Sequence, residues 1–292
     1  MSRIEKSLEK AIEMRESLRK GNGNGGDVLI SPEAKAGIAK FGPCEIVIDI
    51  EGVDRRIVCI RQPDTAVAEQ YRKLRARILK NADADSLNTI MITSSQIGEG
   101  KTLTAVNLAA AIAGEIDHTV LLVDADLRNP TVHKYLGMEP GGGLSDYLKG
   151  GVKLGDVLIK TGIGKLVVLP AGNPPDNPSE LLSSDRMKAL VKELKDRYKD
   201  RYIIFDSSPL LVTADPISLA GYMDGVLLVV QSARTTPKAA RKALSLLKGC
   251  RVLGSVFNNV PGYLAGHIYP YNYGKAYAAQ ERYPDATRGG GD

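Results

Sequence analysis

The sequence predicts an α/β fold with a doubly wound, mostly parallel sheet. Short apolar runs have the length and composition of buried strands: 89–93, 119–123, 165–169, 202–205, 225–230 and 251–257. Segments with helical spacing of apolar residues separate them, which is typical of parallel strands joined by crossover helices. Two of the runs end in aspartates, Asp124 and Asp206, and the carboxyl ends of parallel strands share one edge of a sheet. We therefore expect a functional site at this edge.

The stretch from Ser94 to Thr102 has the layout of a P-loop: strand, glycine loop, lysine, hydroxyl residue, helix. The glycines let the backbone wrap a phosphate, and the N-terminus of the next helix adds a favourable dipole. Lys101 supplies a charge for the β- and γ-phosphates, and the Thr102 hydroxyl can ligate Mg²⁺. Ser95 stands where the usual spacing has glycine, so an ordinary turn is the alternative. The predicted ligand is ATP with Mg²⁺, bound by Gly98, Glu99, Gly100, Lys101, Thr102 and Leu103.

Polar side chains follow the strands that flank this loop. Asp124 and Asp126 come after the run 119–123, and Asp206 ends the run 202–205 in the layout of a Walker B strand. Such carboxylates can hold Mg²⁺ through water, although aspartate after a strand is also a common turn residue. We predict Lys101, Asp124, Asp126 and Asp206 as catalytic residues, and Thr102, Asp124 and Asp206 as the metal site. Arg128 and Asn258, whose amide can read an adenine edge, complete the predicted nucleotide site.

The chain divides into four predicted parts. Residues 1–20 form a helix that either packs on the body or docks a partner, and its mixed charge disfavours a membrane surface. Residues 21–61 begin with a flexible glycine-rich linker and continue into a small segment in which 45–50 and 56–60 could be two strands. Residues 62–262 form the main domain, which opens with a helix over 65–80. Residues 263–292 form a tail.

Two further features lie outside the P-loop region. Glu69, Arg72 and Arg75 recur on one strip of the helix over 65–80, either as an exposed charged face or as a self-complementary contact between subunits. Half of the twelve tyrosines lie in the last thirty residues, which lack the apolar periodicity of a helix or a strand. These exposed tyrosines are candidate phosphoryl acceptors: Tyr269, Tyr271, Tyr273, Tyr277 and Tyr283.

The composition excludes several classes of protein. A net charge of +5, dispersed along the chain, is too mild to indicate nucleic-acid binding. No apolar run approaches the roughly 20 residues of a membrane span, and the N-terminus lacks a signal-type apolar core, so we expect a cytoplasmic protein. Cys44, Cys59 and Cys250 are far apart in the sequence, which suits a reducing compartment and argues against a zinc site.

Together these motifs resemble the bacterial tyrosine kinase family of polysaccharide export systems, which belongs to the deviant P-loop ATPases. The resemblance runs from about residue 62 to residue 260, and includes the tail. Its most specific parts are the P-loop, the aspartate motif 123–128, the Walker B segment 203–209, the phrases 169–172 and 177–182, and the triplet Glu69, Arg72 and Arg75. The opening residues 1–6 look like the stand-alone autokinases of exosortase-linked exopolysaccharide clusters.

The resemblance implies an ATP·Mg²⁺-dependent autokinase that phosphorylates its own tyrosine tail in trans and regulates exopolysaccharide polymerisation and export. It also implies a ring-type homo-oligomer joined through the charged triplet, and a phosphotyrosine phosphatase that reverses the reaction. The sequence departs from the family at Ser208, which replaces the first of two usual prolines and leaves Asp206 intact. It also lacks the fused membrane adaptor of some members. We therefore expect a separate membrane co-polymerase that recruits the protein to the cytoplasmic membrane, with residues 1–20 as the contact.

Two other functions remain open from the sequence. A regulatory or partitioning-type ATPase of the same superfamily would use ATP to dimerise, and the tyrosines would be incidental. The lysine-containing start of the partitioning-type loop is absent, since Ser95, Gln96 and Ile97 stand there, and this favours the kinase. A nucleotide-binding scaffold without enzymatic activity is the third candidate, and the intact set of Lys101, Thr102 and three aspartates argues against it.

Overall fold

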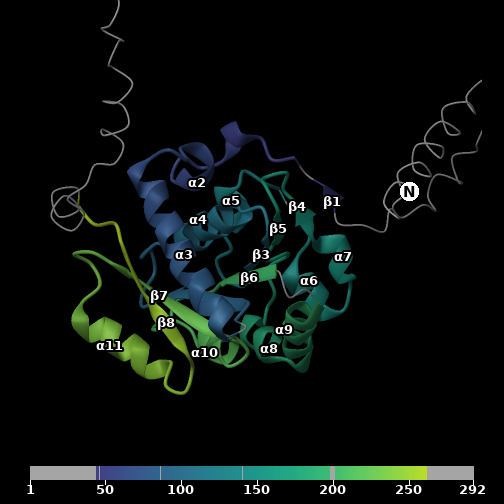
Figure 1. The fold of residues 1–292 in the computed structure, drawn as a ribbon. Coiled ribbons are helices and arrows are strands. Elements are labelled where there is room, and N and C mark those ends of the chain that lie inside the picture. The colour runs from purple at the N-terminus through teal and green to yellow at the C-terminus, as the bar shows by residue number, and fades with distance from the viewer. Residues whose placement is uncertain (1–43, 46, 86, 140, 198–200, 262–292) are drawn as a thin grey trace, which may run out of the picture. The chain divides into compact units, whose positions relative to one another are not determined.

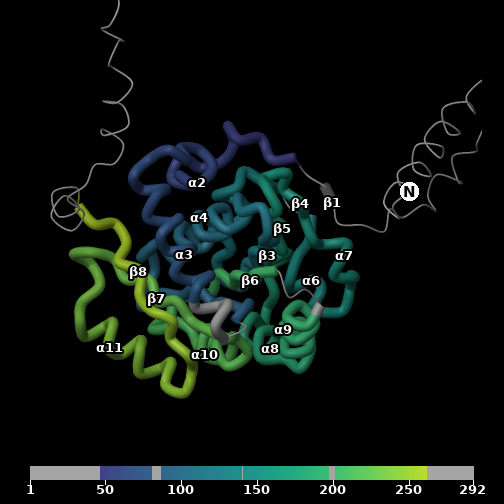
Figure 2. Tube along the Cα trace, in the orientation of Figure 1, coloured from purple at the N-terminus to yellow at the C-terminus, as the bar shows by residue number. Residues whose placement is uncertain are grey.

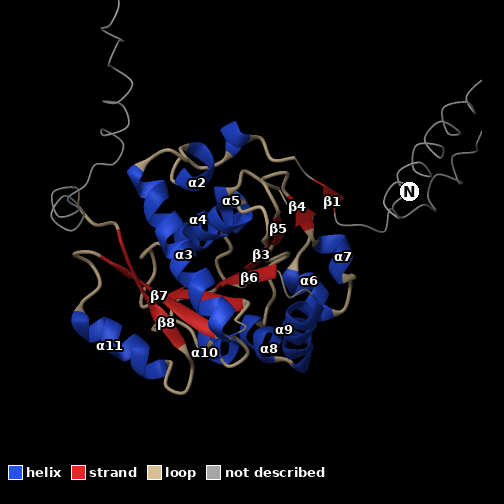
Figure 3. Ribbon diagram, in the orientation of Figure 1, coloured by secondary structure: helices blue, strands red, loops and turns tan. Residues whose placement is uncertain are grey.

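The computed structural model describes residues 44–45, 47–85, 87–139, 141–197 and 201–261. Its described strands form one sheet of eight in the order β1-β4-β5-β3-β6-β2-β7-β8, with helices on both faces (Figures 1 and 3). The pairings are parallel except that of β4 with β5, so the predicted doubly wound, mostly parallel sheet is confirmed. The strands are β1 (Cys44–Glu45), β2 (Thr89–Ser94), β3 (Thr119–Asp124), β4 (Ile159–Lys160), β5 (Leu166–Leu169), β6 (Arg201–Asp206), β7 (Gly225–Gln231) and β8 (Val252–Asn258).

The helices divide into two layers because the central strands are apolar on both faces. In β2, Ile90 and Ile92 face one core and Met91 faces the other, as the alternation of side chains along a strand requires. The first core is covered by α2 (Val58–Arg61), α3 (Ala66–Asp85), α4 (Lys101–Ala113) and α5 (Val132–Tyr135). The second is covered by α6 (Leu144–Lys149), α7 (Leu154–Val157), α8 (Pro178–Ser183), α9 (Asp185–Arg197), α10 (Asp215–Ala220) and α11 (Pro237–Leu246).

Local sequence signals explain where several helices begin. The Thr236 side chain caps α11 by accepting a hydrogen bond from the Ala239 N–H at 3.2 Å, and Pro237 follows at the first helical position. Asp146 accepts from the Gly143 N–H at 2.9 Å at the start of α6. Helix α4 is different, because its N-cap is Gly100 and no side chain caps it. Its first N–H groups therefore remain available at the edge of the sheet where β2 ends.

The prediction of a strand over 56–60 is wrong. Residues Val58–Arg61 form the short helix α2, and Ile50–Gly52 form the 3₁₀ turn η2. The side chain of Asn107 in α4 decides the local structure: its Oδ1 accepts from the Cys59 N–H, and its Nδ2 donates to the Arg56 carbonyl, both at 3.1 Å. Backbone groups that a strand would pair with a neighbouring strand are thus satisfied by α4. Of the predicted strand 45–50, only Glu45 lies in a strand among the described residues, at the end of β1 (Cys44–Glu45).

The remaining long elements agree with the predictions to within a few residues. The predicted helix over 65–80 is α3, which packs beside α4 (Figure 2). The docking helix of residues 1–20, the linker after it and the tyrosine tail 263–292 lie outside the described residues. None of the described helices combines the length and apolar character needed to cross a membrane.

Candidate active site

The loop between β2 and α4 has the backbone conformation of a phosphate cradle. Gly98 has φ +79° and Gly100 has φ +94°, a left-handed region that L side chains rarely adopt. A Cβ on Gly100 would also lie 2.0 Å from the Asn258 Nδ2 atom. Both glycines are therefore required by the path of the chain, as the motif predicts.

The N–H groups from Ile97 into the first turn of α4 have no competing partners among the described residues. Within the described part of the chain, no backbone hydrogen bond is donated by residues 97–103. The first turn of α4 belongs to this run, and the dipole of a 13-residue helix favours an anion at the same place. A run of N–H groups that point away from other protein groups, around two left-handed glycines, is an arrangement that can bind a phosphate.

Lys101, Thr102 and Asp206 form a compact cluster below the loop. The Thr102 hydroxyl donates to Asp206 Oδ2 at 2.6 Å, and Lys101 Nζ donates to Thr102 Oγ1 at 3.1 Å. Lys101 Nζ also lies 2.8 Å from Asp126 Oδ2 and 3.7 Å from Asp206 Oδ1. The three predicted strand ends therefore meet, since these residues follow β2, β3 and β6.

Asp124 faces the same cluster from β3, where it is paired in register with Asp206. Its Oδ2 accepts from the backbone N–H groups of Thr131 and Val132 at 3.2 and 3.1 Å, and its Oδ1 accepts from that of Asp126 at 3.3 Å. These donors fix the orientation of a side chain that is completely buried. Asp124 is thus held rigidly in a place where its charge is costly.

Burial shifts the pKa values of the buried charges. It raises the pKa of Asp206 to about 6, although Lys101 and the Thr102 hydrogen bond oppose the shift. It also raises the pKa of Asp124 well above its ordinary value, and the charge of Asp206 adds to this effect. Burial disfavours the ammonium of Lys101, yet the carboxylates of Asp206 and Asp126 keep its pKa above the ordinary value. The site holds an excess of negative charge that a cation would relieve.

These residues fit a magnesium nucleotide. Asp206 Oδ1 is buried and has no hydrogen-bond partner among the described residues, so a metal-bound water could donate to it. The Thr102 hydroxyl lies on the other oxygen of the same carboxylate. No group of three described histidine, cysteine, aspartate or glutamate side chains could hold a metal. Mg²⁺ binds through few protein ligands and takes the rest from phosphates and water, so a hydroxyl and a carboxylate are a sufficient protein contribution.

Arg128 is held in place by a partner that the sequence did not reveal. Its Nε donates to Asp215 Oδ2 at 2.7 Å, and its Nη2 donates to Ser179 Oγ at 2.9 Å. Asp215 is buried at the start of α10, and its hydrogen bond raises the pKa of Arg128. Arg128 thus sits at the carboxyl edge in a fixed position, while a contact to nucleotide stays a prediction.

Other predicted residues take part in the fold of the loop. The Asn258 amide donates to the Glu99 carbonyl at 3.0 Å, and the Glu99 carboxylate is buried and bonded to Thr235. Neither contact tests the predicted binding of nucleotide. Sequence reasoning missed Thr235 and its neighbour Arg234, although both follow the apolar run 225–230. The rule that drew attention to Asp206, polar residues just after a buried strand, would have found them.

The charged triplet of α3 makes contacts within the chain. Arg72 Nε lies 2.6 Å from Glu69 Oε2, with both side chains about two-fifths exposed. Arg75 instead pairs with Glu115 at 2.5 Å and donates to the Ala111 carbonyl at 2.9 Å. The triplet is therefore one exposed pair and one more buried arginine, and its role between subunits stays a prediction.

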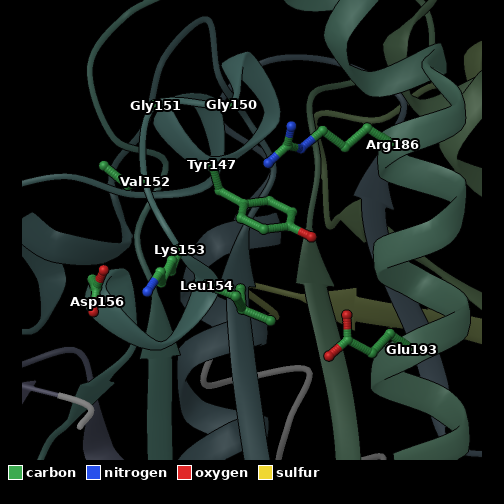
Figure 4. Close-up of a pocket in the computed structure, with 9 residues that line it drawn as sticks. All are labelled: Tyr147, Gly150, Gly151, Val152, Lys153, Leu154, Asp156, Arg186 and Glu193. Atoms are coloured by element: carbon green, nitrogen blue, oxygen red, sulfur yellow. The ribbon is translucent and has the colours of Figure 1, made fainter. Parts of the chain in front are cut away.

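A second surface feature is separate from this site. An open hollow between α6, α7 and α9 contains Tyr147, whose ring centroid lies 4.8 Å from the Arg186 guanidinium (Figure 4). None of its lining residues belongs to the P-loop or to the ends of β3 and β6. The nucleotide chemistry described above does not involve it.

Comparison with known proteins assigns the chain to a family. A family model described as an AAA domain matches residues 87–248. Tyrosine-protein kinase YwqD of Bacillus subtilis is 37% identical over 208 residues, which cover 70% of this chain and 86% of that protein. This chain belongs to the bacterial tyrosine kinases. The kinase domain of the Escherichia coli tyrosine kinase ETK superposes with a TM-score of 0.66 and 28% identity, covering 81% of this chain and 95% of that one.

The kinase also shares its fold with ATPases that have other names. The septum site-determining protein MinD of Pyrococcus horikoshii, solved in complex with Mg-ADP, has a TM-score of 0.50 and 25% identity, over 62% of this chain and 76% of that one. The predicted family, fold and enzyme class are thereby confirmed: this bacterial tyrosine kinase is a P-loop enzyme that phosphorylates protein tyrosine.

Proposed function

We propose that this kinase transfers the γ-phosphoryl group of ATP·Mg²⁺ to tyrosines in the C-terminal segment of a second copy of itself. The observation that carries the proposal is the cluster of Lys101, Thr102 and Asp206 at the uncapped start of α4. Such a cluster supplies the charge, the hydroxyl and the carboxylate that phosphoryl transfer requires.

Each group has a separate task. When bound, Mg²⁺ would neutralise part of the charge of the phosphates. Thr102 would ligate it directly, and Asp206 and Asp124 would hold it through water. Lys101, whose ammonium is stabilised by Asp126 and Asp206, would turn toward the charge that develops between the β- and γ-phosphates.

The proposed transfer makes one bond and breaks one bond, and it releases the proton of the tyrosine hydroxyl. The bond between the γ-phosphorus and the β–γ bridging oxygen breaks as the phenolic oxygen bonds to phosphorus, and ADP leaves. The phenol loses its proton, and Asp124 is the proposed acceptor. Because burial raises the pKa of Asp124, its affinity for a proton is closer to that of a phenol, whose pKa is about 10.

The proposed acceptors are Tyr269, Tyr271, Tyr273, Tyr277 and Tyr283. Transfer in trans needs two copies held together, and the exposed Glu69–Arg72 pair is the proposed contact, with Arg75 behind it. Each phosphate adds about −1.5 to −2 charge, so several on neighbouring tails would repel one another. Phosphorylation would therefore weaken the assembly that produced it.

We further propose a place for the enzyme in exopolysaccharide polymerisation and export. A membrane co-polymerase would recruit it to the inner face of the cytoplasmic membrane through residues 1–20, and a phosphotyrosine phosphatase would reset it. The support is the resemblance of residues 1–6 and of the motifs above to kinases of polysaccharide systems.

The intact mass of the full chain after incubation with ATP·Mg²⁺ tests the kinase proposal. We expect several added phosphates in the native protein, none in Lys101→Met, and few in a chain whose five tail tyrosines are changed to phenylalanine. Mixing Lys101→Met with that tail variant tests transfer in trans, because only the inactive copy then carries acceptors. ATP hydrolysis without any tyrosine phosphate would favour a regulatory or partitioning-type ATPase instead.

A further inference from the structure

The segment after β7 forms hydrogen bonds with the P-loop, although it belongs to neither the P-loop motif nor the aspartate motifs. Arg234 Nη1 donates to the Gly98 carbonyl at 3.2 Å. The Thr235 hydroxyl donates to Glu99 Oε1 at 2.5 Å. The Asn258 amide at the end of β8 adds the hydrogen bond to the Glu99 carbonyl at 3.0 Å. Consecutive P-loop residues are therefore held by two neighbouring strand ends.

These contacts orient the N–H groups of the loop. In a trans peptide unit the C=O and the following N–H point in opposite directions. When Arg234 holds the Gly98 carbonyl, the Glu99 N–H must point the other way. Asn258 has the same effect on the Gly100 N–H through the Glu99 carbonyl. Both N–H groups belong to the run without partners among described residues, which is the arrangement that a phosphate needs.

The Glu99 side chain is kept out of the cradle by the same segment. Its carboxylate is completely buried, and its second oxygen accepts from the Gln96 N–H at 3.0 Å. The Thr235 hydroxyl that donates to it accepts in turn from the Gln231 N–H at 2.8 Å. A carboxylate that turned toward the loop centre would repel phosphate, so Thr235 removes a negative charge from the binding side.

The backbone of this segment is strained just before the residues whose side chains reach the P-loop. Ala233 has φ +58°, an uncommon conformation for a residue with a Cβ, and it directly precedes Arg234. The Ser232 N–H donates to the Asn258 carbonyl at 2.9 Å, which ties the turn to β8. Strain of this kind persists only where surrounding contacts impose it, and it is frequent beside functional sites.

We infer that Arg234 and Thr235 are positioning residues for ATP: they hold the Gly98 carbonyl and the Glu99 carboxylate outside the P-loop so that its N–H groups face the phosphates. The inference rests only on the ATP-binding part of the proposed function. It does not depend on which tyrosine is phosphorylated. Since the N–H contacts are made before and during transfer, their loss weakens ATP binding more than it slows the bound complex.

The experiment compares Arg234→Ala, Arg234→Lys and Arg241→Ala in the full chain. Arg241 is an exposed arginine on α11, so its variant matches the loss of charge without the loop contact. We expect Arg234→Ala to raise the Kd for ATP·Mg²⁺, measured by calorimetry, about five- to tenfold. Arg234→Lys should restore most of the affinity because it keeps a donor, and Arg241→Ala should leave the Kd unchanged.

Thr235→Val and Thr235→Ser form the second pair. Valine keeps the shape and removes the hydroxyl, so we expect ATP affinity to fall as it does for Arg234→Ala, whereas serine should keep it. In tyrosine transfer by both variants that lose the contact, the KM for ATP should rise, while kcat should stay within about twofold of the native value. An unchanged Kd in Arg234→Ala and Thr235→Val overturns the inference, as does a lower thermal midpoint with unchanged affinity. Altered affinity in a chain that transfers no phosphate keeps the inference and rejects the kinase proposal.

Discussion

The Thr102 hydroxyl donates to Asp206 Oδ2 at 2.6 Å across 104 residues of sequence, while Asp206 Oδ1 has no hydrogen-bond partner among the described residues. The P-loop hydroxyl and the Walker B carboxylate are thus already joined, and one buried oxygen is left over. This asymmetry has consequences for activity and for stability that can be measured separately.

Replacing Thr102 by valine should cost both activity and stability. The valine keeps the volume but leaves both oxygens of the buried Asp206 without a hydroxyl donor, which costs about 1–3 kcal/mol in the free energy of unfolding. Tyrosine transfer should fall at least about 100-fold, since the proposed Mg²⁺ ligand is gone. Thr102→Ser is the control and should retain most of both. Urea unfolding and phosphate incorporation are the measurements.

The pH dependence of stability should report the buried charge of Asp206. Its pKa in the folded protein is about 6, above the ordinary value, because of burial, so the folded state binds a proton more tightly than the unfolded chain. Its contribution to stability is therefore lost as the pH rises from about 4 to above 6. The Asp206→Asn variant does not lose stability in this way, so its free energy of unfolding relative to that of the native protein should rise over this pH range.

Asp224 provides the control with the opposite sign. Burial acts to raise its pKa, but hydrogen bonds from Lys195 and from the backbone and side chain of Thr89 lower it below the ordinary value. Its ionised form stabilises the fold at any pH above the pKa that Asp224 has in the unfolded chain. This stabilisation is lost only as the pH falls through the lower pKa that Asp224 has in the folded protein. Asp224→Asn should be destabilised by a constant amount between pH 5 and 7 (about 1–3 kcal/mol). Parallel curves for the two variants would contradict both assignments.

Gly100 should not tolerate a side chain. Alanine would need a left-handed backbone at φ +94° and would place its Cβ 2.0 Å from the Asn258 amide nitrogen. The P-loop and the Asn258 side chain that holds it would therefore both move. We expect ATP binding to be lost beyond detection by calorimetry. Gly114→Ala is the matched control, because Gly114 ends the same helix at φ −74° and a Cβ there meets nothing nearer than 3.7 Å. That variant should bind ATP normally and gain up to about 1 kcal/mol.

Much of the fold and of the site could be predicted because strong local patterns coincide with the tertiary structure. The central strands are buried on both faces and therefore read as continuous apolar runs. The glycine spacing predicts the cradle, and the aspartates follow strands whose carboxyl ends share an edge. Where a residue's local pattern and its tertiary role agree, as at Lys101 and Asp206, sequence reasoning is sufficient.

The rest depends on contacts between distant segments that leave no local pattern. The run 56–60 looks like a strand, and only the Asn107 side chain of α4 shows why part of it is helical. Arg234 and Thr235 meet Gly98 and Glu99 across 136 residues. No spacing within one element encodes such a meeting: the sequence can place these two residues after a strand, but only the folded chain shows which P-loop groups they contact.

Asp215 should act through Arg128. It is the buried acceptor that fixes the guanidinium at 2.7 Å, so Asp215→Asn keeps a hydrogen bond and removes the charge that holds it. We expect ATP affinity and tyrosine transfer to fall about tenfold, because the predicted contact of Arg128 with the nucleotide loses the charge that holds its guanidinium in place. Ser179→Ala, which removes only the neutral partner, should have a smaller effect. Unchanged ATP affinity in Asp215→Asn would mean that Arg128 does not contact the nucleotide.

Arg72 should separate assembly from folding, whereas Arg75 should not. The Glu69–Arg72 pair is exposed and separated by three residues on one helix, so Arg72→Glu should change the unfolding free energy by less than about 1 kcal/mol. Arg75 is tied to Glu115 and to the Ala111 carbonyl, so Arg75→Ala should cost more. If the proposed subunit contact is right, light scattering should show Arg72→Glu as a smaller species that still binds ATP, and adding Glu69→Arg should restore the assembly by exchanging the two charges. An Arg72→Glu protein with the mass of the native assembly would mean that this strip is an ordinary charged surface of α3.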